Sequence, residues 1–332
     1  MRILAPPPRT QVEPLAEPPK LSIVIATYEA ADTVAAAVRS ALEQTLPAHE
    51  VIVVDDGSRD DVAGALCDYR DRIELVRKEN GGGASALNAG AGVASGDFLA
   101  ILDADDAYDP RRVEALAEIA GKRPDLDLIT TDAAFMVDGE QVGRFSDYTP
   151  FVTEGQRTAI FQSCFAGGWP AIRLDSLRAA GGFDESLRTG YDWECWARLI
   201  LGGSQAGMVD EPFYLYRLHS GTLTSSRASS LWDRVTLLEK CEDAPSLSGD
   251  EQAALRRALR LHRSRAVEAE AQDALYGTAP RANLLRRALL PGIQARARAV
   301  ALATVLAPPL ARRVVPEYYP AEERLGAEEP AG

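Results

Sequence analysis

The chain contains 332 residues, of which 46% are hydrophobic and 26% are charged, as in ordinary soluble proteins with one large domain or two smaller ones. Its formal net charge of −13 at pH 7 excludes a nucleic-acid-binding protein, because phosphates would be repelled. The same charge permits a phosphate-bearing substrate, since a metal ion can neutralise both partners locally.

The cysteines and the apolar runs predict a cytoplasmic protein. The four cysteines are far apart and form no C-x-x-C pair, which fits neither a zinc site nor a disulfide framework. The N-terminal apolar run stops at three consecutive prolines, residues 6–8, so it lacks the apolar core of a signal peptide. The apolar run 299–311 is too short to cross a membrane and is interrupted at Pro308 and Pro309.

From Leu21 onward, short β-branched runs alternate with amphipathic stretches, whereas residues 1–19 are rich in proline and are predicted to be disordered. The pattern predicts, in order, strand 21–27, helix 31–44, strand 50–56, strand 72–77, helix 84–95 and strand 97–106. Strands joined through helices predict right-handed βαβ units and an α/β fold with a mainly parallel central sheet flanked by helices. Such sheets bind ligands beyond the carboxyl ends of their strands, where polar residues gather here at 27–29, 55–58 and 103–106.

The order of elements becomes mixed after residue 125. A hairpin is predicted around Asp138-Gly139, then a helix from about Asp192 to Leu201 and a strand pair within 206–218. From about residue 226 the chain is rich in Ala, Leu and Arg and is predicted to be helical. We therefore expect four parts: a disordered N-terminus (1–19), a sheet domain (20–225), a C-terminal helical extension (226–314) and an acidic tail (315–332).

The segment LDADD, residues 102–106, places three carboxylates at the end of a predicted strand: Asp103, Asp105 and Asp106. Such carboxylates repel one another unless a cation is present, and hard oxygen ligands suit Mg²⁺ or Mn²⁺. The alternative is an Asp-rich turn that caps the next helix, because Asp109-Pro110 follows.

Two further segments could contact a nucleotide. The strand ending in Asp55-Asp56 places a carboxylate where it can accept a hydrogen bond from a base or ribose, or it caps a helix beginning near Asp60. The glycine-rich run 79–90 opens a helix whose amides can face a phosphate or leave room for a flat base. It lacks a G-K-[ST] ending and does not follow the first strand, so it is neither a Walker loop nor a dinucleotide fingerprint.

Two more residues are candidates for chemistry. Asp192 lies near the start of a helix that carries Trp193 and Trp196, where it can serve as a general base. The alternative is a first-turn aspartate that the helix dipole favours. His219 follows a strand-like run, and a lone histidine of this kind is more often structural or solvated than a metal ligand.

Six segments together resemble the family-two glycosyltransferases of the GT-A fold, in their usual order and approximate spacing. They are SIVIATYEA, ALEQTLPAHEVIVVDDGSRDD, ENGGGASALNAGAGVASGDFLAILDADD, GGFDESL, GYDWECWARL and YRLHSGTLTS. The resemblance covers roughly residues 20–225, which it implies to be the catalytic domain.

The resemblance implies a role for each matching position. Tyr28, Glu29 and Asp56 would hold the nucleobase, with Asp56 accepting from a base N–H. Asp103 and Asp105 match the first and last residues of the D-x-D motif, near the ribose and on the metal. The implied nucleotide-sugar site comprises Thr27, Tyr28, Glu29, Asp56, Gly82, Asn88, Asp103, Ala104 and Asp105. The implied metal ligands are Asp105, Asp106 and His219, and Asp192 would be the catalytic base.

Three departures from the family pattern are visible. Glu29 replaces the usual Asn, Tyr191 replaces the Glu that usually precedes the base, and the Q-x-x-R-W motif of processive synthases is absent. The resemblance therefore implies an inverting transferase that adds one sugar per encounter, in the synthesis of a polysaccharide, glycolipid or other cell-surface glycan. Its partners would be a nucleotide-diphosphate-sugar donor and an acceptor hydroxyl, which a lipid-linked glycan could provide.

Two alternatives remain. One is a nucleotidyltransferase of related fold, although the G-x-G-T-R-type loop expected after its first strand is missing. The other is a membrane-surface or glycan-binding module built on a degenerate transferase domain. Residues 281–313 contain seven arginines and no acidic residue, which predicts peripheral contact with an anionic membrane at the inner face. The same stretch could instead pack on the catalytic domain with its arginines solvated.

Overall fold

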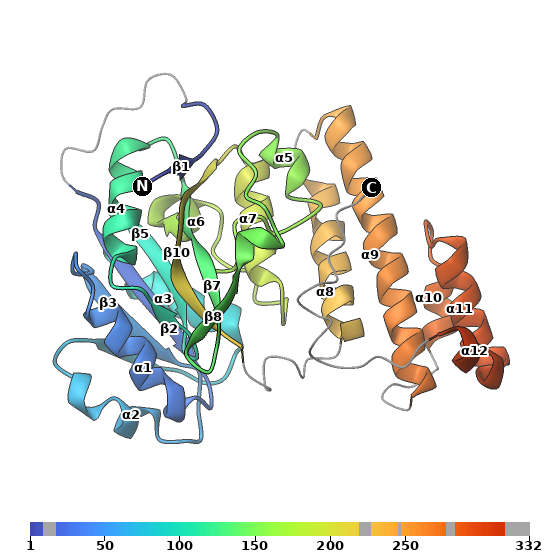
Figure 1. Ribbon diagram of the computed structural model, residues 1–332, viewed down its shortest axis with the longest axis horizontal. Coiled ribbons are helices and arrows are strands. Elements are labelled where there is room, and N and C mark those ends of the chain that lie inside the picture. The colour runs from blue at the N-terminus through green and yellow to red at the C-terminus, as the bar shows by residue number, and fades with distance from the viewer. Residues whose placement is uncertain (9–17, 219–226, 245–246, 277–282, 316–332) are drawn as a thin grey trace. The chain divides into compact units, whose positions relative to one another are not determined.

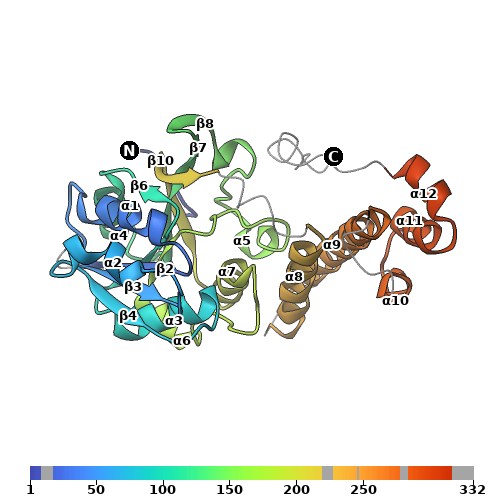
Figure 2. The ribbon, with the colours of Figure 1, turned by 90° about the horizontal axis from the view of Figure 1, so that it is seen from below.

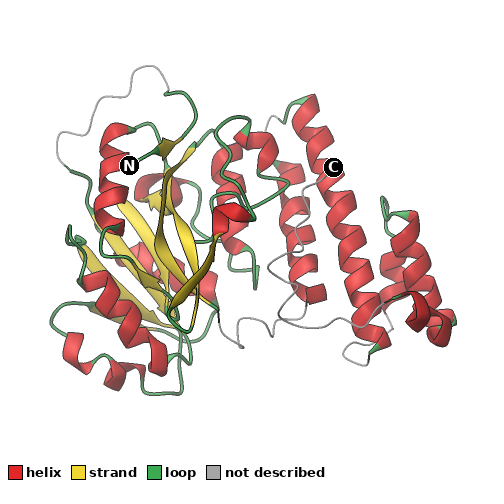
Figure 3. Cartoon of the chain, in the orientation of Figure 1, coloured by secondary structure: helices red, strands yellow, loops and turns green. Residues whose placement is uncertain are grey.

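The structure is a computed structural model that describes residues 1–8, 18–218, 227–244, 247–276 and 283–315. Its contacts divide the chain into two compact units, Met1–Leu218 and His219–Gly332. Within the described ranges, the first unit contains the strands and the second unit is helical (Figures 1 and 3).

The first unit is built on one mixed sheet with the strand order β1-β10-β7-β9-β5-β2-β3-β4, to which β6 and β8 add on β10 and β7. Strands β2, β3, β4 and β5 are parallel to one another, and β9 runs antiparallel between β5 and β7. In chain order the strands are β1 Ile3–Leu4, β2 Leu21–Thr27, β3 Glu50–Asp55, β4 Glu74–Arg77, β5 Phe98–Asp103, β6 Ala107–Tyr108, β7 Leu128–Val137, β8 Glu140–Arg144, β9 Ala171–Arg173 and β10 Ala206–Arg217.

Helices cover both faces of the sheet, as the apolar strands require. They are α1 Ala31–Leu42, α2 Val62–Ala65, α3 Gly83–Val93, α4 Arg112–Lys122, α5 Gln156–Ala159, α6 Leu174–Ala179 and α7 Tyr191–Leu201, with short 3₁₀ turns at Cys67–Tyr69 and Phe145–Asp147. The predicted strands and helices between residues 21 and 106 are confirmed within a few residues, because their β-branched runs and amphipathic stretches end at the same polar segments.

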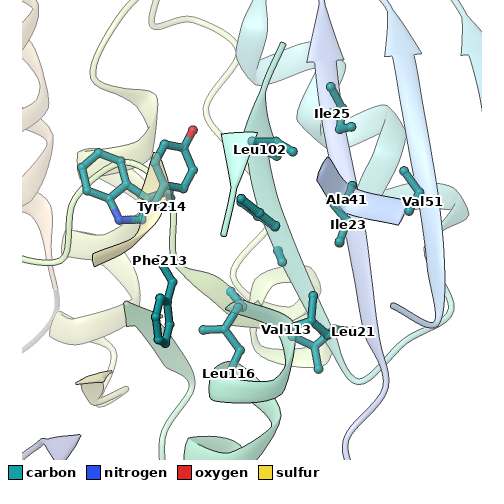
Figure 4. Close-up of a cluster of buried hydrophobic side chains, with 14 of the residues drawn as sticks. Leu21, Ile23, Ile25, Ala41, Val51, Leu102, Val113, Leu116, Phe213 and Tyr214 are labelled. Carbon is teal, nitrogen blue, oxygen red and sulfur yellow. The ribbon is translucent and has the colours of Figure 1, made fainter. Parts of the chain in front are cut away.

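The two faces follow from the alternation of side chains along β2. Ile23 and Ile25 belong to a buried cluster with Ala41 of α1 and Leu116 of α4 (Figure 4). The intervening Val24 faces α3, where Gly90 lies so close that a Cβ there would overlap the valine. Figure 2 shows α1 and α4 on one side of the sheet and α3 on the other. The carboxyl ends of the parallel strands are thereby left uncovered by helices at one edge.

The hairpin predicted at Asp138-Gly139 is confirmed, since β7 and β8 pair around it and both turn residues have positive φ, 50° and 86°. The strand pair predicted within 206–218 is wrong. A single strand, β10, runs through this segment with a register shift between Val209 and Tyr214. Pro212 lies in that shift, and the two halves of β10 pair with different short strands, β1 and β6. The interrupted pattern therefore resembled two strands.

The prediction of a disordered N-terminus is wrong for its first residues. Ile3 and Leu4 form β1, which pairs antiparallel with β10 opposite Val209 and Met208. Both side chains are apolar and half-buried. The backbone of β1 pairs with β10, whose backbone groups would otherwise be unpaired at this part of the sheet edge. Residues 9–17 of the same predicted segment lie outside the described residues.

The second unit contains α8 Arg227–Lys240, α9 Gly249–Leu275, α10 Leu284–Ala288, α11 Ala295–Leu306 and α12 Pro308–Val314, with a 3₁₀ turn at Cys241–Asp243. Small residues let α9, α10 and α11 pack closely, as Ala271, Ala288, Ala297 and Ala301 are all buried in one cluster. Ser248 and Glu251 form a capping box that starts α9. None of the described helices is long and apolar enough to cross a membrane.

Candidate active site

The acidic residues of LDADD lie at the uncovered end of β5. Asp103 is the last residue of that strand, and Asp105 and Asp106 follow in the turn. They line a cavity of about 300 Å³ together with Ala104, Tyr28 and Tyr216. The structure thus brings the D-x-D carboxylates together with Tyr28, which ends up there because β2 and β5 are parallel neighbours.

Tyr214 of β10 forms hydrogen bonds with this acidic turn. Its hydroxyl donates to the Asp106 Oδ2 at 2.7 Å and accepts from the backbone N–H of Asp103 at 3.3 Å. The other Asp106 oxygen accepts from the backbone N–H of Arg217 at 2.8 Å. Asp106 is buried and engaged on both oxygens, so its carboxylate is fixed in place, whereas Asp103 opens into the cavity.

Burial and the proximity of other carboxylates disfavour ionisation of the acidic turn. Burial, and then the charge of Asp103, raise the pKa of Asp106 to about 8. Desolvation by the surrounding protein, followed by the charges of Asp105 and Asp192, raises the pKa of Asp103 to about 7. Because Asp103 is open to the cavity, solvent there moderates the repulsion. A cation bound beside these carboxyl groups would favour their ionised forms.

Asp192 lies in the first turn of α7 and close enough to the acidic turn for its charge to act on Asp103. Its Oδ2 also approaches Gly168, where an added Cβ would be 2.8 Å away. Any larger residue at 168 would therefore push against the carboxylate. The preceding Tyr191 directs its ring toward α3, where its hydroxyl fills the space beside Gly83 that a Cβ would occupy.

The carboxylate of Asp56 already accepts hydrogen bonds within the protein, whereas the resemblance implies that it binds a nucleobase. Its two oxygens accept hydrogen bonds from the backbone N–H groups of Gly81 and Gly82, at 3.0 and 2.7 Å. The Lys78 ammonium lies 2.7 Å from Oδ1. The buried carboxylate thus fixes the glycine-rich loop at the start of α3. Sequence analysis missed Lys78, and a lysine just after a strand carries no motif that would have marked it.

The surroundings of Glu29 and Thr27 also differ from those expected of residues that only contact a nucleotide-sugar donor. Glu29 has φ of 52°, its N–H donates to Ser58 Oγ at 3.0 Å, and its carboxylate accepts from the Arg59 N–H at 2.9 Å. It therefore joins the loops after β2 and β3. Thr27 is buried at the end of β2, and no hydrogen-bond partner for its hydroxyl is found among the described residues.

Asn88, which was also predicted to bind the nucleotide sugar, does not line this cavity. Asn88 uses its side-chain amide to donate to the Phe183 carbonyl and to accept from the Phe183 N–H, at 2.9 and 2.7 Å, so it fixes the 182–185 loop onto α3. His219 lies outside the described residues.

A buried arginine behind the acidic turn escaped the sequence analysis. Arg112 is fully buried; its Nη2 donates to the Trp169 carbonyl at 2.7 Å, and Nη1 donates to Thr131. Its guanidinium lies 4.6 Å from the Tyr108 ring and 5.0 Å from the Tyr214 ring, and Trp169 stacks on Tyr214 at 4.7 Å. Arg112 on α4 therefore contacts β6, β7, β10 and the loop before β9, and of these β10 carries the tyrosine that binds the acidic turn.

Arg112→Ala is expected to lower the free energy of unfolding by about 3 kcal/mol, because it leaves a cavity, the unpaired Trp169 carbonyl and two rings without their cation. Urea denaturation followed by tryptophan fluorescence measures this loss. The neighbouring Arg111 is the control, since its side chain is exposed and Arg111→Ala should leave the free energy of unfolding nearly unchanged. Equal effects of the two substitutions would contradict the structural role of Arg112.

The residues fit a hard divalent cation, although no preformed cage of three His, Cys, Asp or Glu ligands occurs in the described part of the chain. Mg²⁺ is commonly held by one or two carboxylates together with the phosphates of a substrate. The cavity offers such a set, with Asp105 and the open Asp103 beside a fixed Asp106. The raised pKa values of Asp103 and Asp106 agree with buried carboxyl groups that repel one another in the absence of a cation.

Comparisons with known proteins agree with this geometry. The sequence pattern of "Glycosyl transferase family 2" matches residues 22–179. The chain is 32% identical over 263 residues to the succinoglycan biosynthesis protein ExoU of Rhizobium meliloti (strain 1021), which covers 73% of this chain and 75% of ExoU.

Two solved structures share the fold. S. aureus TarS 1-349 in complex with UDP-GlcNAc superposes with a TM-score of 0.62 at 18% identity and covers 89% of this chain and 90% of that one. Mannosyltransferase PcManGT from Pyrobaculum calidifontis, in complex with GDP-Man and Mn²⁺, gives a TM-score of 0.58 at 20% identity, with 96% and 90% covered. At such identities the likeness shows the fold, a GT-A sheet flanked by helices.

Proposed function

The chain belongs to glycosyl transferase family 2, and from this premise we propose that it transfers one sugar from a nucleotide-diphosphate donor to an acceptor hydroxyl with inversion. The observation that carries the proposal is the cavity of about 300 Å³ at the end of β5, where the D-x-D carboxylates meet Tyr28 and lie near Asp192. Family membership makes the chain a glycosyltransferase, so the nucleotidyltransferase alternative is no longer needed.

The nucleotide is proposed to bind along the carboxyl ends of β2, β3 and β5. Tyr28 is 47% exposed and lines the cavity, so its ring is available to stack on a base. Asp56 is proposed to act on the nucleotide mainly by holding Gly81 and Gly82 in place. Asp103, open to the cavity, is proposed to face the ribose.

Asp105, with Asp106 and Asp103 beside it, is proposed to hold Mg²⁺ or Mn²⁺ between the protein and the donor diphosphate. When bound, such a cation neutralises the charge that develops on the departing nucleoside diphosphate. Tyr214 keeps the acidic turn in register through its hydrogen bonds to Asp106 and Asp103. His219, which lies outside the described residues, is also proposed to bind this cation.

Asp192 is proposed to be the general base. It takes the proton of the acceptor hydroxyl as the acceptor oxygen bonds to the anomeric carbon and the bond from that carbon to the diphosphate oxygen breaks. Attack from the side opposite the leaving group inverts the configuration. Gly168 leaves the space that the Asp192 carboxylate occupies.

The acceptor is proposed to belong to a polysaccharide or other cell-surface glycan, on which this protein adds a single sugar. The support is the name of its relative ExoU, a succinoglycan biosynthesis protein. An acceptor carried on a lipid is part of the same proposal, which places the enzyme at the inner membrane face.

Thermal unfolding with a panel of nucleotide sugars tests the donor proposal. One UDP- or GDP-sugar is expected to raise the unfolding temperature when Mn²⁺ is present and much less in excess chelator, because at 100 times the dissociation constant a ligand stabilises the fold by about 2.7 kcal/mol. The matching nucleoside monophosphate, which lacks the second phosphate, is the control. Stabilisation by glycans alone, with no response to any nucleotide sugar, would favour the binding-module alternative.

A further inference from the structure

Helix α11 is apolar on both of its sides. Its inner side packs into the second unit through Ala297, Ala301 and Thr304, all of which are buried. Ala295, Ala299, Leu302 and Leu306 recur at helical spacing on the opposite side, and all four are exposed. The outer side of α11 therefore exposes apolar side chains opposite the side that packs into the second unit, with the exposed Arg296 and Arg298 between the two sides.

The exposed leucines continue into α12. Leu302, Leu306 and Leu310 are 36%, 76% and 58% exposed, and Leu306 is the most exposed large hydrophobic residue in the described chain. Leu302 and Leu306 lie one turn apart on α11, and Leu310 follows on α12 after the non-helical Ala307. We name these three residues the α11–α12 leucines. Exposed apolar runs of this kind mark interaction sites.

Positive charge surrounds these leucines. Arg296 and Arg298 lie at the start of α11, Arg312 and Arg313 lie at the end of α12, and residues 283–315 contain no Asp or Glu. Arg296 is 83% exposed, and its contact with Glu268 is long, 3.7 Å. Arg313 is also exposed. This concentration of positive charge stands out in a chain whose net charge is −13.

We propose that the face formed by α11 and α12 docks on an anionic lipid surface. The α11–α12 leucines would enter the boundary between headgroups and acyl chains, and the flanking arginines would contact lipid phosphates. Long arginine side chains can reach the headgroups while their stems stay in apolar surroundings. Arg298 and Arg312 also donate to the carbonyl groups of Ala288 and Leu275, so Arg296 and Arg313 are the arginines best placed to contact lipid.

A second copy of the chain fits this face poorly. In a two-fold symmetric dimer the same patch would face itself, so two patches of like charge would meet without an acidic residue from 283–315 between them. Lipid phosphates supply the missing negative charge. The inference goes beyond the proposed function, because vesicle binding requires neither donor nor turnover and can fail independently of them.

Cosedimentation with lipid vesicles tests the proposal on the full chain. Vesicles of mixed phosphatidylcholine and phosphatidylglycerol are compared with phosphatidylcholine alone, at low and at high ionic strength. The unmodified protein is expected to sediment with the anionic vesicles at low ionic strength and to be released at high ionic strength, because salt screens charges beyond about 8 Å under physiological conditions and at shorter range above them.

Two double variants separate the apolar and the charged contributions. Leu306→Asn with Leu310→Asn, and Arg296→Gln with Arg313→Gln, are each expected to lower the partition onto anionic vesicles about tenfold or more. Val142→Asn and the pair Arg256→Gln with Arg257→Gln are the controls, because these residues are also exposed but lie on β8 and α9. All substituted side chains are exposed, so folding should be retained and circular dichroism verifies it.

Three results would overturn the proposal. The unmodified protein could stay in the supernatant with anionic vesicles at low ionic strength, or the control variants could lose binding as strongly as the test variants. The third would be a dimer, detected by sedimentation velocity, that Leu306→Asn with Leu310→Asn converts to monomers while vesicle binding stays unchanged. That outcome would assign the face to contacts between copies of the chain.

Discussion

Asp192→Asn is expected to lower the turnover rate by about 100-fold or more while leaving the affinity for nucleoside diphosphate nearly unchanged. The asparagine keeps the size of the side chain but cannot accept the acceptor's proton. The carboxylate lies near Asp103 and against Gly168, on α7 instead of on the strands that carry the proposed nucleotide site. Removing its charge should therefore affect the chemical step and spare donor binding.

Asp175→Asn provides the matched control. Asp175 also lies in the first turn of a helix, α6, but it is exposed and does not line the cavity. If Asp192 merely interacts favourably with its helix dipole, both substitutions should cost about 0.3–1 kcal/mol of stability and neither should change turnover. Initial rates of nucleoside diphosphate release, together with nucleotide titrations, distinguish these cases. A variant that loses donor affinity but keeps its turnover rate would make Asp192 a donor-site residue.

The sequence predicts the parallel half of the sheet well because its strands are buried on both faces. Residues 21–27 and 50–55 have continuous apolar centres, 23–26 and 51–54, so the type and limits of these strands are readable without knowledge of their neighbours. The acidic turn after β5 is predictable for the same reason. The polar end of a buried parallel strand lies at the ligand-binding edge wherever the remaining chain goes.

The support behind the acidic turn could not be predicted, because it depends on contacts between distant segments. Arg112 lies on α4, Trp169 lies in the loop before β9, and Tyr214 lies on β10. No spacing in the sequence indicates that these three residues meet. Tyr214 lies beyond the register shift of β10, which hid the direction of its side chain. Asp56 and Asn88 match the family pattern, yet local hydrogen bonds to backbone groups account for much of what their side chains do.

Asp105→Asn is expected to weaken Mn²⁺-dependent donor binding by about 100-fold, and excess chelator should do the same to the unmodified protein. Of the three acidic residues that line the cavity, Asp106 is buried and accepts from Tyr214 and Arg217, whereas Asp103 is exposed and Asp105 is half-buried. Removing one charge from this set lowers the attraction for a divalent cation and leaves the donor diphosphate facing uncompensated carboxylates.

The pKa values give this prediction a pH dependence with a definite sign. Folding raises the pKa of Asp103 to about 7 and that of Asp106 to about 8, from 3.8. A carboxyl group with a raised pKa binds its proton more tightly in the folded state, so the cation-free fold loses stability as the pH rises from about 4 to about 8. A cation competes with those protons. Stabilisation by Mn²⁺ should therefore increase between pH 6 and pH 8 and then level off.

Thermal unfolding of the nucleotide-free protein at pH 6, 7 and 8, with Mn²⁺ or with chelator, measures this dependence. Asp109→Asn is the control, because Asp109 lies just after the acidic turn but pairs with Arg111 outside the cavity. The Asp105→Asn protein should show a smaller Mn²⁺ effect at every pH, whereas Asp109→Asn should follow the unmodified chain. A Mn²⁺ effect that is equal in all three proteins, or that declines as the pH rises, would remove the cation from this turn and leave Tyr214 and Asp106 with a structural role alone.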